Sequence, residues 1–398
     1  MAETDRDVVV LGVARTPFGR FGGKLEAAPT AILAARTIDT LLARTGVDPA
    51  RIDSVYAGVG MIGAGVLTPA RQAVLRSALP AETPSLTVDR ACCSGMTAIG
   101  LGWKDIKLGL ADLVICGGAE NLSGTPFLWP RQRGSRPGPV DVRDPLMLRA
   151  DFLDKAIAAY TGEEALRFGV DREQQDAWAV QSHQRYFAAD AAGYFDVERF
   201  PWPAERGNAP ALEADESPRR DATPEKLATL KTVYGSPTVT AGNAPGLNDG
   251  AAFLLLGSRA IAKALGAEPL ATIADYVQVA DGPTSGSYTP AIAIGKLLRR
   301  ADRKIETMRL IEINEAFAAT PLVSTLRLAD SDRKAADRLR ERTNLHGGAV
   351  ALGHPLGASG ARLAMTLING LRRAGGGEGV TAICGGYGQG DGLLLKVA

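Results

Sequence analysis

The stretch GHPLGASG, residues 353–360, decides how the rest of this sequence is interpreted. It places His354, one of only three histidines in the chain, beside a proline in a glycine-rich loop, ahead of an alanine-rich run at 361–373 that we predict as a helix. The proline favours extended backbone at the histidine, and the glycines let the backbone approach a bound molecule. An isolated His-Pro pair is usually an ordinary loop feature, but the cysteine-containing stretches at 92–95 and 384–386 favour a catalytic role.

Length and composition predict a globular protein of two or three domains. A chain of 398 residues is too long for one ordinary core, and its 45% hydrophobic and 22% charged residues are typical of globular proteins. Lysine and arginine number 45 against 44 aspartate and glutamate residues, a net charge of +1. This balance gives no reason to expect nucleic acid or a membrane surface as a partner.

The sequence features that report on the cellular compartment favour the cytoplasm. Residues 1–7 are acidic and polar, unlike a signal or transit peptide, and no apolar run approaches the roughly 20 residues of a membrane span. Four cysteines are too few for a secreted disulfide framework, and no Cys-x-x-Cys or His-x-x-x-His pair is present. We therefore expect free thiols, no metal site and a cytoplasmic location.

Short apolar runs alternate with helical patterns along most of the chain. We predict strands at 8–13, 54–59, 85–88, 113–116, 251–257, 271–279 and 310–313, and helices at 29–44, 68–79, 94–110, 290–300 and 315–328. This alternation predicts an α/β fold with buried strands. Between them lies a long irregular segment with helices predicted at 155–168 and 172–189, which we interpret as an insertion with a binding role.

The second half of the sequence echoes the first. A Ser-Gly pair at 94–95 opens a helix that leads to ICGG at 115–118, and a second Ser-Gly pair at 359–360 opens a helix that leads to ICGG at 383–386. Such self-similarity suggests two similar halves. We predict a first half at 1–118 that is completed by about 247–268, an inserted domain at 119–246, and a second half at 269–398.

Cys92 is the best candidate for a nucleophile. It lies between a predicted strand and a predicted helix, and a helix N-terminus should lower the pKa of a thiol there. The alternative is a small buried packing residue, which suits its neighbour Cys93 better. A nucleophilic thiol also needs a base, for which we favour His354. His183 lies in a predicted helix and is expected to be a surface or packing residue, while His346 is ambiguous.

Taken together, these motifs resemble those of the thiolases, the family of acetyl-CoA acetyltransferases and 3-ketoacyl-CoA thiolases. The resemblance covers nearly the whole chain and rests on residues 13–19 (VARTPFG), 92–96 (CCSGM), 117–123 (GGAENLS), 240–243 (TAGN), 248–252 (NDGAA), 314–318 (NEAFA), 353–355 (GHP) and 384–386 (CGG). It implies a duplicated, layered α/β fold with an inserted loop domain. It also implies a homodimer or homotetramer and a role in fatty acid metabolism.

The resemblance implies a two-step Claisen exchange between acyl-CoA molecules. In it, Cys92 holds the acyl group, His354 accepts the thiol proton, and Cys384 exchanges a proton with the carbon beside the second thioester. Backbone N–H groups of Cys92 and Gly386 would stabilise one oxyanion, and His354 with a water held by Asn314 would stabilise the other. Without the resemblance, a helix cap is the better interpretation of Asn314.

Coenzyme A and its acyl thioesters are the implied substrates, with no permanently bound cofactor. The implied coenzyme contacts are Arg219, Lys226, Ala244 and Pro245, although Arg219 suits a solvated surface position equally well. The sequence also departs from the family pattern. Tyr387 replaces a glycine after the last cysteine motif, and a His-Met pair common near the pantetheine is missing from 155–165.

Two other functions remain open at this stage. A decarboxylating ketoacyl synthase shares the duplicated fold, but it usually places two histidines, or a histidine and an asparagine, beside one cysteine. Here Cys384 occupies the second basic position, which favours the thiolase. A non-catalytic acyl-CoA or lipid-binding member of the fold would be expected to lack Cys92, His354 or Cys384.

Overall fold

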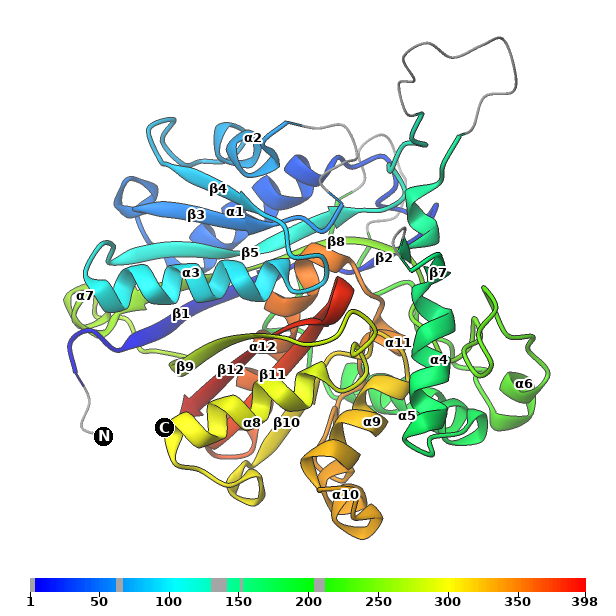
Figure 1. The fold of residues 1–398 in the computed structure, drawn as a ribbon. Coiled ribbons are helices and arrows are strands. Elements are labelled where there is room, and N and C mark those ends of the chain that lie inside the picture. The colour runs from blue at the N-terminus through cyan, green and yellow to red at the C-terminus, as the bar shows by residue number, and fades with distance from the viewer. Residues whose placement is uncertain (1–3, 62–66, 130–141, 151–152, 204–211) are drawn as a thin grey trace.

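The computed structural model describes residues 4–61, 67–129, 142–150, 153–203 and 212–398 (Figure 1). Its strands are β1 (Val8–Arg15), β2 (Gly19–Arg20), β3 (Ser54–Gly58), β4 (Ser85–Val88), β5 (Leu113–Asn121), β6 (Arg149–Ala150), β7 (Lys155–Ala156), β8 (Asn248–Ser258), β9 (Ala271–Ala280), β10 (Leu310–Ile313), β11 (Gly377–Gly385) and β12 (Gln389–Val397). Its α-helices are α1 (Thr30–Thr45), α2 (Pro69–Leu75), α3 (Ser94–Leu108), α4 (Ile157–Arg167), α5 (Arg172–Ala191), α6 (Pro224–Ala228), α7 (Arg259–Leu265), α8 (Thr289–Ala301), α9 (Ala319–Leu328), α10 (Arg333–Arg340), α11 (Ala349–Leu352) and α12 (Leu356–Arg373). Short 3-10 turns lie at η1 (Pro49–Arg51), η2 (Pro145–Met147), η3 (Ile305–Thr307) and η4 (Gly386–Gly388).

The main sheet has the strand order β10-β11-β12-β9-β1-β8-β5-β3-β4, with β2 paired to β8. On each side of the β1–β9 junction the pairings repeat. β1–β8 and β8–β5 are antiparallel and β5–β3 is parallel, while β9–β12 and β12–β11 are antiparallel and β11–β10 is parallel. The predicted duplicated α/β fold is therefore confirmed.

Helices α3 and α12 join the two halves. Both contribute to the largest apolar cluster, and each contacts strands on both sides of the β1–β9 junction. They cross closely because small residues meet there: a Cβ added at Gly95 would overlap the carbonyl oxygen of Gly357, and one at Gly360 would overlap the backbone of Met96. Helices α1 and α2 cover the other side of the first half, and α8 covers that of the second.

Both faces of the central strands are covered, which explains their nearly continuous apolar sequences. Every residue of β5 and of β8 is buried. The segment between these two strands contains the two-stranded β6–β7 hairpin and helices α4, α5 and α6. This segment packs on the second half, because α4 contacts α9 and α5 contacts α11.

Several predicted element boundaries were wrong. The helix predicted from residue 361 begins at Leu356, since small residues let its first turn lie against β3. The helix predicted from residue 315 begins only at Ala319, because tertiary contacts bind the Glu315 carboxylate. In addition, α2 ends at Leu75, β5 continues to Asn121, and residues 155 and 156 form β7 instead of helix.

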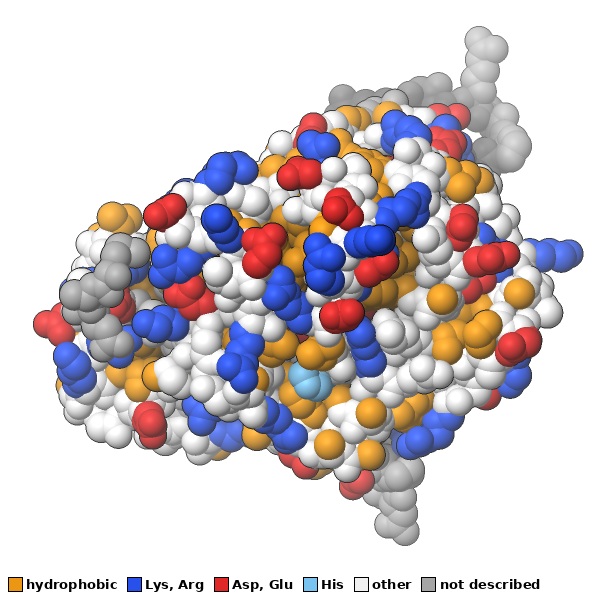
Figure 2. Space-filling model, turned by 90° about the horizontal axis from the view of Figure 1, so that it is seen from below, with side chains coloured by type: hydrophobic (Ala, Val, Ile, Leu, Met, Phe, Trp, Pro, Cys, Tyr) orange, Lys and Arg blue, Asp and Glu red, His pale blue; other side chains and the backbone are white. Residues whose placement is uncertain are grey.

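The surface is mixed in charge. On the face shown in Figure 2, basic and acidic side chains are interspersed, which matches the nearly equal numbers of the two kinds. Within the described residues, no helix has the length and apolar character that a membrane crossing requires.

Candidate active site

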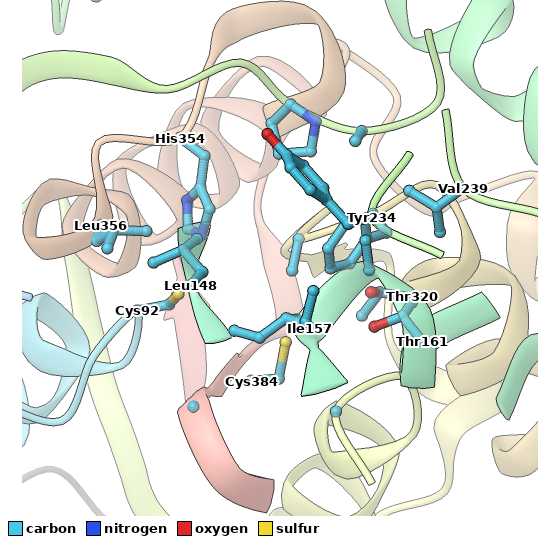
Figure 3. Close-up of a pocket in the computed structure, with 18 of the residues that line it drawn as sticks. Cys92, Leu148, Ile157, Thr161, Tyr234, Val239, Thr320, His354, Leu356 and Cys384 are labelled. Atoms are coloured by element: carbon cyan, nitrogen blue, oxygen red, sulfur yellow. The ribbon is translucent and has the colours of Figure 1, made fainter. Parts of the chain in front are cut away.

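Cys92 lies in a sharp turn between β4 and α3. The turn includes Ala91, whose φ of 50° is in the left-handed region, and this strained geometry turns the Cys92 side chain into a cavity (Figure 3). The neighbouring Cys93 points the other way. Its thiol is fully buried and donates to the carbonyl oxygen of Ile383 at 3.5 Å. The interpretation of Cys93 as a packing residue is confirmed.

His354 is held in the same cavity by contacts at its backbone and at both ring nitrogens. Its N–H donates to Asn248 Oδ1 at 2.9 Å, and its Nδ1 lies 2.6 Å from Ser359 Oγ. The Ser359 hydroxyl donates its single hydrogen to the carbonyl oxygen of Pro355 at 2.9 Å, so it accepts from His354 Nδ1–H. This tautomer leaves Nε2 as a proton acceptor.

Cys384 is near the end of β11, and its side chain lines the cavity with Cys92 and His354 (Figure 3). The strand ends one residue later, and Gly386 begins the turn η4. A Cβ added at Gly386 would lie 3.5 Å from Ala91, so this turn is next to the one that precedes Cys92. The structure thus brings the two cysteines, the histidine and the glycine predicted from sequence into one site.

Asn314 lies behind His354, fully buried. Its Nδ2 is 3.5 Å from His354 Nε2, its N–H donates to the carbonyl oxygen of Ala382 at 3.0 Å, and its Oδ1 has no hydrogen-bonding partner among the described residues. Helix α9 begins at Ala319, so the helix-cap alternative for Asn314 is wrong. The amide is oriented toward the histidine instead.

Burial controls the protonation of the site. It raises the pKa of the Cys92 thiol well above its ordinary range, with smaller contributions from Cys384 and the Glu120 carboxylate. The prediction that the helix N-terminus lowers this pKa was therefore wrong, because desolvation is the larger effect. Burial also raises the pKa of Cys384 to about 12, and burial together with the Arg362 charge lowers that of His354 to about 3. The resting site holds neutral thiols and a neutral imidazole.

The cavity measures about 330 Å³ and is lined mainly by apolar side chains. Three of the four predicted coenzyme residues, Arg219, Ala244 and Pro245, line it. Lys226 is not among the described residues that form the wall, and its exposed ammonium pairs with Asp221 at 3.0 Å.

A second, more polar hollow adjoins the first. The two share Arg219, Ala244 and Leu247, and the second is also lined by Arg20 and Arg220. Three arginines therefore gather at this end of the cavity, together with the carboxylates of Glu216 and Asp221, which also line the second hollow. A group that carries phosphates would find its countercharges at this end.

The other two histidines lie elsewhere. His183 Nδ1 accepts from the backbone N–H of Arg219 at 3.2 Å, and burial followed by the Arg219 charge lowers its pKa to about 4. His346 stacks on Tyr194 with ring centroids 3.7 Å apart, and burial likewise lowers its pKa to about 4. His346 is a packing residue. His183, expected to be a surface or packing residue, is buried and contributes to the wall of the second hollow. No group of three metal-ligating side chains occurs among the described residues.

The sequence analysis missed the role of Glu120, a buried carboxylate at the end of β5. Its oxygens accept from the backbone N–H groups of Gly60 at 2.7 Å, Met61 at 3.2 Å and Gly357 at 2.9 Å. Gly357 is in the first turn of α12, which directly follows His354, so Glu120 fixes the start of that helix. A lone acidic residue at the end of an apolar strand was the available signal.

Comparisons with known proteins agree with this geometry. Residues 8–260 match the family described as "Thiolase, N-terminal domain", and residues 267–397 match "Thiolase, C-terminal domain". The chain is 38% identical to an acetyl-CoA acetyltransferase of Chromobacterium violaceum over 98% of this chain and 99% of that one. It is also 38% identical to a beta-ketoadipyl-CoA thiolase of Pseudomonas aeruginosa, again over 98% and 99%.

Solved structures give the same result. The Bacillus anthracis acetyl-CoA acetyltransferase superposes with a TM-score of 0.92 at 36% identity, over 98% of this chain and 99% of the other. Human mitochondrial 3-ketoacyl-CoA thiolase in complex with CoA superposes with a TM-score of 0.91 at 34% identity, over 99% and 98%.

Proposed function

The chain belongs to the thiolase family and is an acyl-CoA C-acyltransferase, and from this premise we propose that Cys92 carries the acyl group between two half-reactions. The observation that supports this assignment is the shared cavity of Cys92, His354 and Cys384. A thiol, its base and a second thiol acid are the groups that such an exchange requires. The ketoacyl synthase alternative is not favoured, because a cysteine stands at the second basic position.

In the cleavage direction, the Cys92 thiol gives its proton to His354 and attacks the ketone carbon of a 3-ketoacyl-CoA. The bond to the neighbouring carbon breaks, its electron pair forms the enolate of acetyl-CoA, and the Cys384 thiol protonates that carbon. The protonated His354 then returns its proton to the Cys384 thiolate, and coenzyme A gives its own thiol proton to the freed His354 and attacks the acyl-cysteine. The shortened acyl-CoA leaves, and His354 returns its proton to Cys92. Condensation is the reverse sequence.

Hydrogen-bond donors at two places would stabilise the charges that form. The N–H groups of Cys92 and Gly386 are proposed to bind the acyl oxygen, which the adjacency of their two turns supports. His354, with a water held by Asn314, is proposed to bind the enolate oxygen, because the Asn314 amide lies beside the imidazole. One such donor contributes about 3 kcal/mol to the transition state.

Coenzyme A is proposed to enter from the basic end of the cavity as a substrate and not as a permanently bound cofactor. Arg219 would face its phosphates or adenine, and Ala244 and Pro245 its pantetheine arm. We propose the segment predicted at 119–246 as the coenzyme-binding loop domain, with its start moved past Asn121, the end of β5. The first half is then 1–118, completed by about 247–268, and the second half is 269–398. Lys226 would act only at long range, because it lies outside the wall.

The assembly is proposed to be a homodimer or a homotetramer in the cytoplasm, with a role in fatty acid metabolism. Strand β4 is at the edge of the sheet, where unpaired backbone groups can bind a second copy. Exposed apolar residues surround that edge: Leu67 is 84% exposed, Leu75 56% and Leu86 49%. Light scattering should give a mass of two or four chains, and Leu86→Lys should lower it. A monomeric wild type would contradict this assembly.

The acyl-enzyme assignment can be tested by mass spectrometry after incubation with acetyl-CoA. Wild type and Cys93→Ser should each gain one acetyl group, whereas Cys92→Ser should gain none, because an unactivated hydroxyl is a far poorer nucleophile than a thiolate. The Cys93 variant is the matched control for a neighbouring thiol. An acetyl group retained by the Cys92 variant, or found on Cys93, would exclude the proposed role.

A further inference from the structure

Arg90 connects the turn that carries Cys92 to the second half of the molecule. It precedes Cys92 by two residues, and its side chain reaches β12, where Nε donates to Gln389 Oε1 at 2.9 Å and Nη1 pairs with the carboxylate of Asp391. These two partners are 299 and 301 residues away along the chain. One side chain therefore joins the two halves next to the nucleophile.

Buried partners hold the far end of Arg90. The Asp391 side chain is fully buried, and its Oδ2 accepts from the hydroxyl groups of Thr97 at 2.5 Å and Tyr276 at 2.8 Å. Thr97 is on α3 and Tyr276 is on β9, so the carboxylate is fixed from two elements. A buried carboxylate with both oxygens bound has little freedom to move, and it gives the Arg90 guanidinium one defined position.

The guanidinium in turn determines how the Gln389 side chain is oriented. A guanidinium can only donate hydrogen bonds, so the amide oxygen of Gln389 faces Arg90 and the amide nitrogen faces away from it. That nitrogen donates to the carbonyl oxygen of Gly386 at 3.3 Å. The turn at Gly386 is thus connected through Gln389 to Arg90.

The backbone of Arg90 belongs to the other turn, the one at Cys92. Its N–H donates to Ser94 Oγ at 2.9 Å, and its carbonyl oxygen accepts from the N–H of Cys93 at 3.1 Å. A Cβ added at Gly385 would lie 2.8 Å from this same carbonyl oxygen, so the two turns meet at Arg90. The residue contacts one turn through its main chain and holds the other through its side chain.

The turn at Gly386 needs support from outside. Strand β11 ends at Gly385, and neither Gly385 nor Gly386 has a side chain that could pack against its surroundings. A Cβ added at Gly386 would meet only Ala91, at 3.5 Å. An N–H group that stabilises an oxyanion is most effective when it is fixed before the charge forms. The hydrogen bond from Gln389 supplies this support.

We propose that Arg90 is a positioning residue that acts through Gln389. It holds the turn at Gly386 against the turn at Cys92 and so fixes the spacing of the two N–H groups that bind the acyl oxygen. The inference rests on the proposed function, since the role of these N–H groups is part of it. Neither Arg90 nor Gln389 lines the described part of the cavity, so both act on the reaction through the two turns and not by touching the substrate.

Gln389→Glu tests the connection with the smallest change of shape. Glutamate keeps an oxygen for Arg90 Nε but places a second acceptor opposite the Gly386 carbonyl oxygen, where no hydrogen bond can form. We expect the rate of Cys92 acylation by acetyl-CoA to fall at least about tenfold, because one oxyanion donor is misplaced, while KM changes little. Rapid-quench mass spectrometry measures this rate.

Gln72→Glu is the matched control. The Gln72 side chain donates to the carbonyl oxygen of Leu67 at 2.8 Å from α2, and neither residue lines the cavity, so the same exchange should leave acylation unchanged. Infrared spectra of the acetyl-enzyme add a readout that a merely structural role would not move. Hydrogen bonds from the two N–H groups weaken the thioester C=O bond, so its carbon-13-edited band should lie at higher wavenumber in Gln389→Glu than in wild type or the control.

Arg90→Lys tests the other end of the connection. An ammonium group can still pair with Asp391, but it lacks the planar fork that holds Gln389 and Asp391 together. We expect a loss similar to that of Gln389→Glu, and no further loss when the two substitutions are combined, because both act through one connection. Additive losses would overturn the inference. This variant decides the matter if Gln389→Glu does not fold.

The outcomes separate the inference from the proposed function. A wild-type acylation rate and an unshifted carbonyl band in folded Gln389→Glu would overturn the inference and leave the proposed function standing. If the wild-type protein forms no acetyl group on Cys92, the proposed function itself fails.

Discussion

The tetrapeptide ICGG occurs near the end of β5 and again near the end of β11, and the two copies have different structural surroundings. In β5 the strand continues for three residues past Gly118, which pairs with Ala252 of β8. A Cβ at Gly118 would overlap the carbonyl oxygen of Gly357. In β11 the strand ends at Gly385, and a Cβ added at Gly386 would meet only Ala91 at 3.5 Å. The first glycine pair permits close packing, whereas the second opens the backbone to the cavity.

The cysteines of the two copies differ in the same way. Cys116 is fully buried in the apolar cluster between the halves, next to Gly102 of α3. Cys384 lines the cavity with His354. The two halves thus contain the same strand motif, ICGG. The position at which the strand ends determines whether the residues of the motif pack in the core, as in β5, or line the cavity, as in β11.

Replacing each cysteine by alanine should give the largest contrast. Cys384→Ala should reduce carbon–carbon cleavage by more than about 10⁴-fold, because the enolate loses its acid, while acyl transfer to Cys92 partly survives. Cys116→Ala should leave both half-reactions near wild type and lower stability by about 1 kcal/mol through a small cavity. Acyl exchange with labelled coenzyme A and cleavage of a 3-ketoacyl-CoA measure the two half-reactions separately.

If Cys384→Ala instead lowers both half-reactions alike in a folded protein, the residue supports the structure and the contrast with Cys116 disappears. A large loss of cleavage in Cys116→Ala would have the same meaning, because that thiol has no access to the cavity. Circular dichroism and thermal unfolding of both variants separate these outcomes from misfolding.

Strands β3 and β10, which pair with β5 and β11 respectively, differ in the same way as the two ICGG copies. β3 ends at Gly58, which packs on the backbone of α3, while β10 is followed by Asn314, whose amide faces His354. Asn314→Ala should lower kcat for cleavage by about 10²-fold, because support for the enolate oxygen is lost. Asn369→Ala is the control: its Nδ2 donates to Tyr194 at 2.5 Å, away from the site. An equal loss in both variants would assign Asn314 to packing.

Glu120 connects the two halves, and its removal should have a smaller effect. Glu120→Gln should lower kcat about tenfold with little change in KM, because Gln has one acceptor oxygen for three N–H groups and His354 shifts slightly. Glu163→Gln, on the exposed side of α4, is the control. A change in KM alone would indicate that Glu120 acts on substrate binding.

The pH dependence of stability gives a second measurement on Glu120. Burial raises its pKa from about 4.5 to about 7, so the folded state binds more protons between these values. Its contribution is complete below pH 4.5 and is lost as the pH rises through 7. The Tm of wild type minus that of Glu120→Gln should therefore fall between pH 5 and pH 7.5. A flat difference would mean that the carboxylate is charged throughout this range.

The sequence predicted those features of the fold and the site that depend on patterns among neighbouring residues. Seven strands of the main sheet, the repeated ICGG and the positions of Cys92, His354 and Cys384 follow from local patterns, whereas β11, which holds Cys384, and β12 were not predicted as strands. It failed where contacts between distant residues decide the outcome. Glu315 is the clearest case: its carboxylate accepts from Trp178 Nε1 at 2.8 Å, 137 residues away, which delays the start of α9.

The pKa of Cys92 was mispredicted for the same reason. A helix N-terminus can be read from sequence, but the desolvation that outweighs it depends on which segments cover the thiol. Glu120 was overlooked because its three partners lie after β3 and in the first turn of α12, the latter 237 residues away. Local sequence therefore identifies the reactive groups, and tertiary burial sets their protonation.

A substitution at Tyr387 should have the smallest effect of those predicted here. It tests the turn that follows β11, which has no counterpart after β5. Tyr387 follows Gly386 in that turn, lines the cavity at 48% exposure, and has a φ of 61°. Tyr387→Gly should relieve about 1 kcal/mol of backbone strain and free space that the phenol occupies.

Because a methylene in an apolar pocket is worth only about 1–3 kcal/mol, the ranking of short and long 3-ketoacyl-CoAs should change more than the best rate does. Values of kcat/KM for acetoacetyl-CoA and 3-ketooctanoyl-CoA in both proteins, with Tm, measure this. A uniform loss of rate with an unchanged ranking would show that Tyr387 holds the turn in place and does not select the acyl chain.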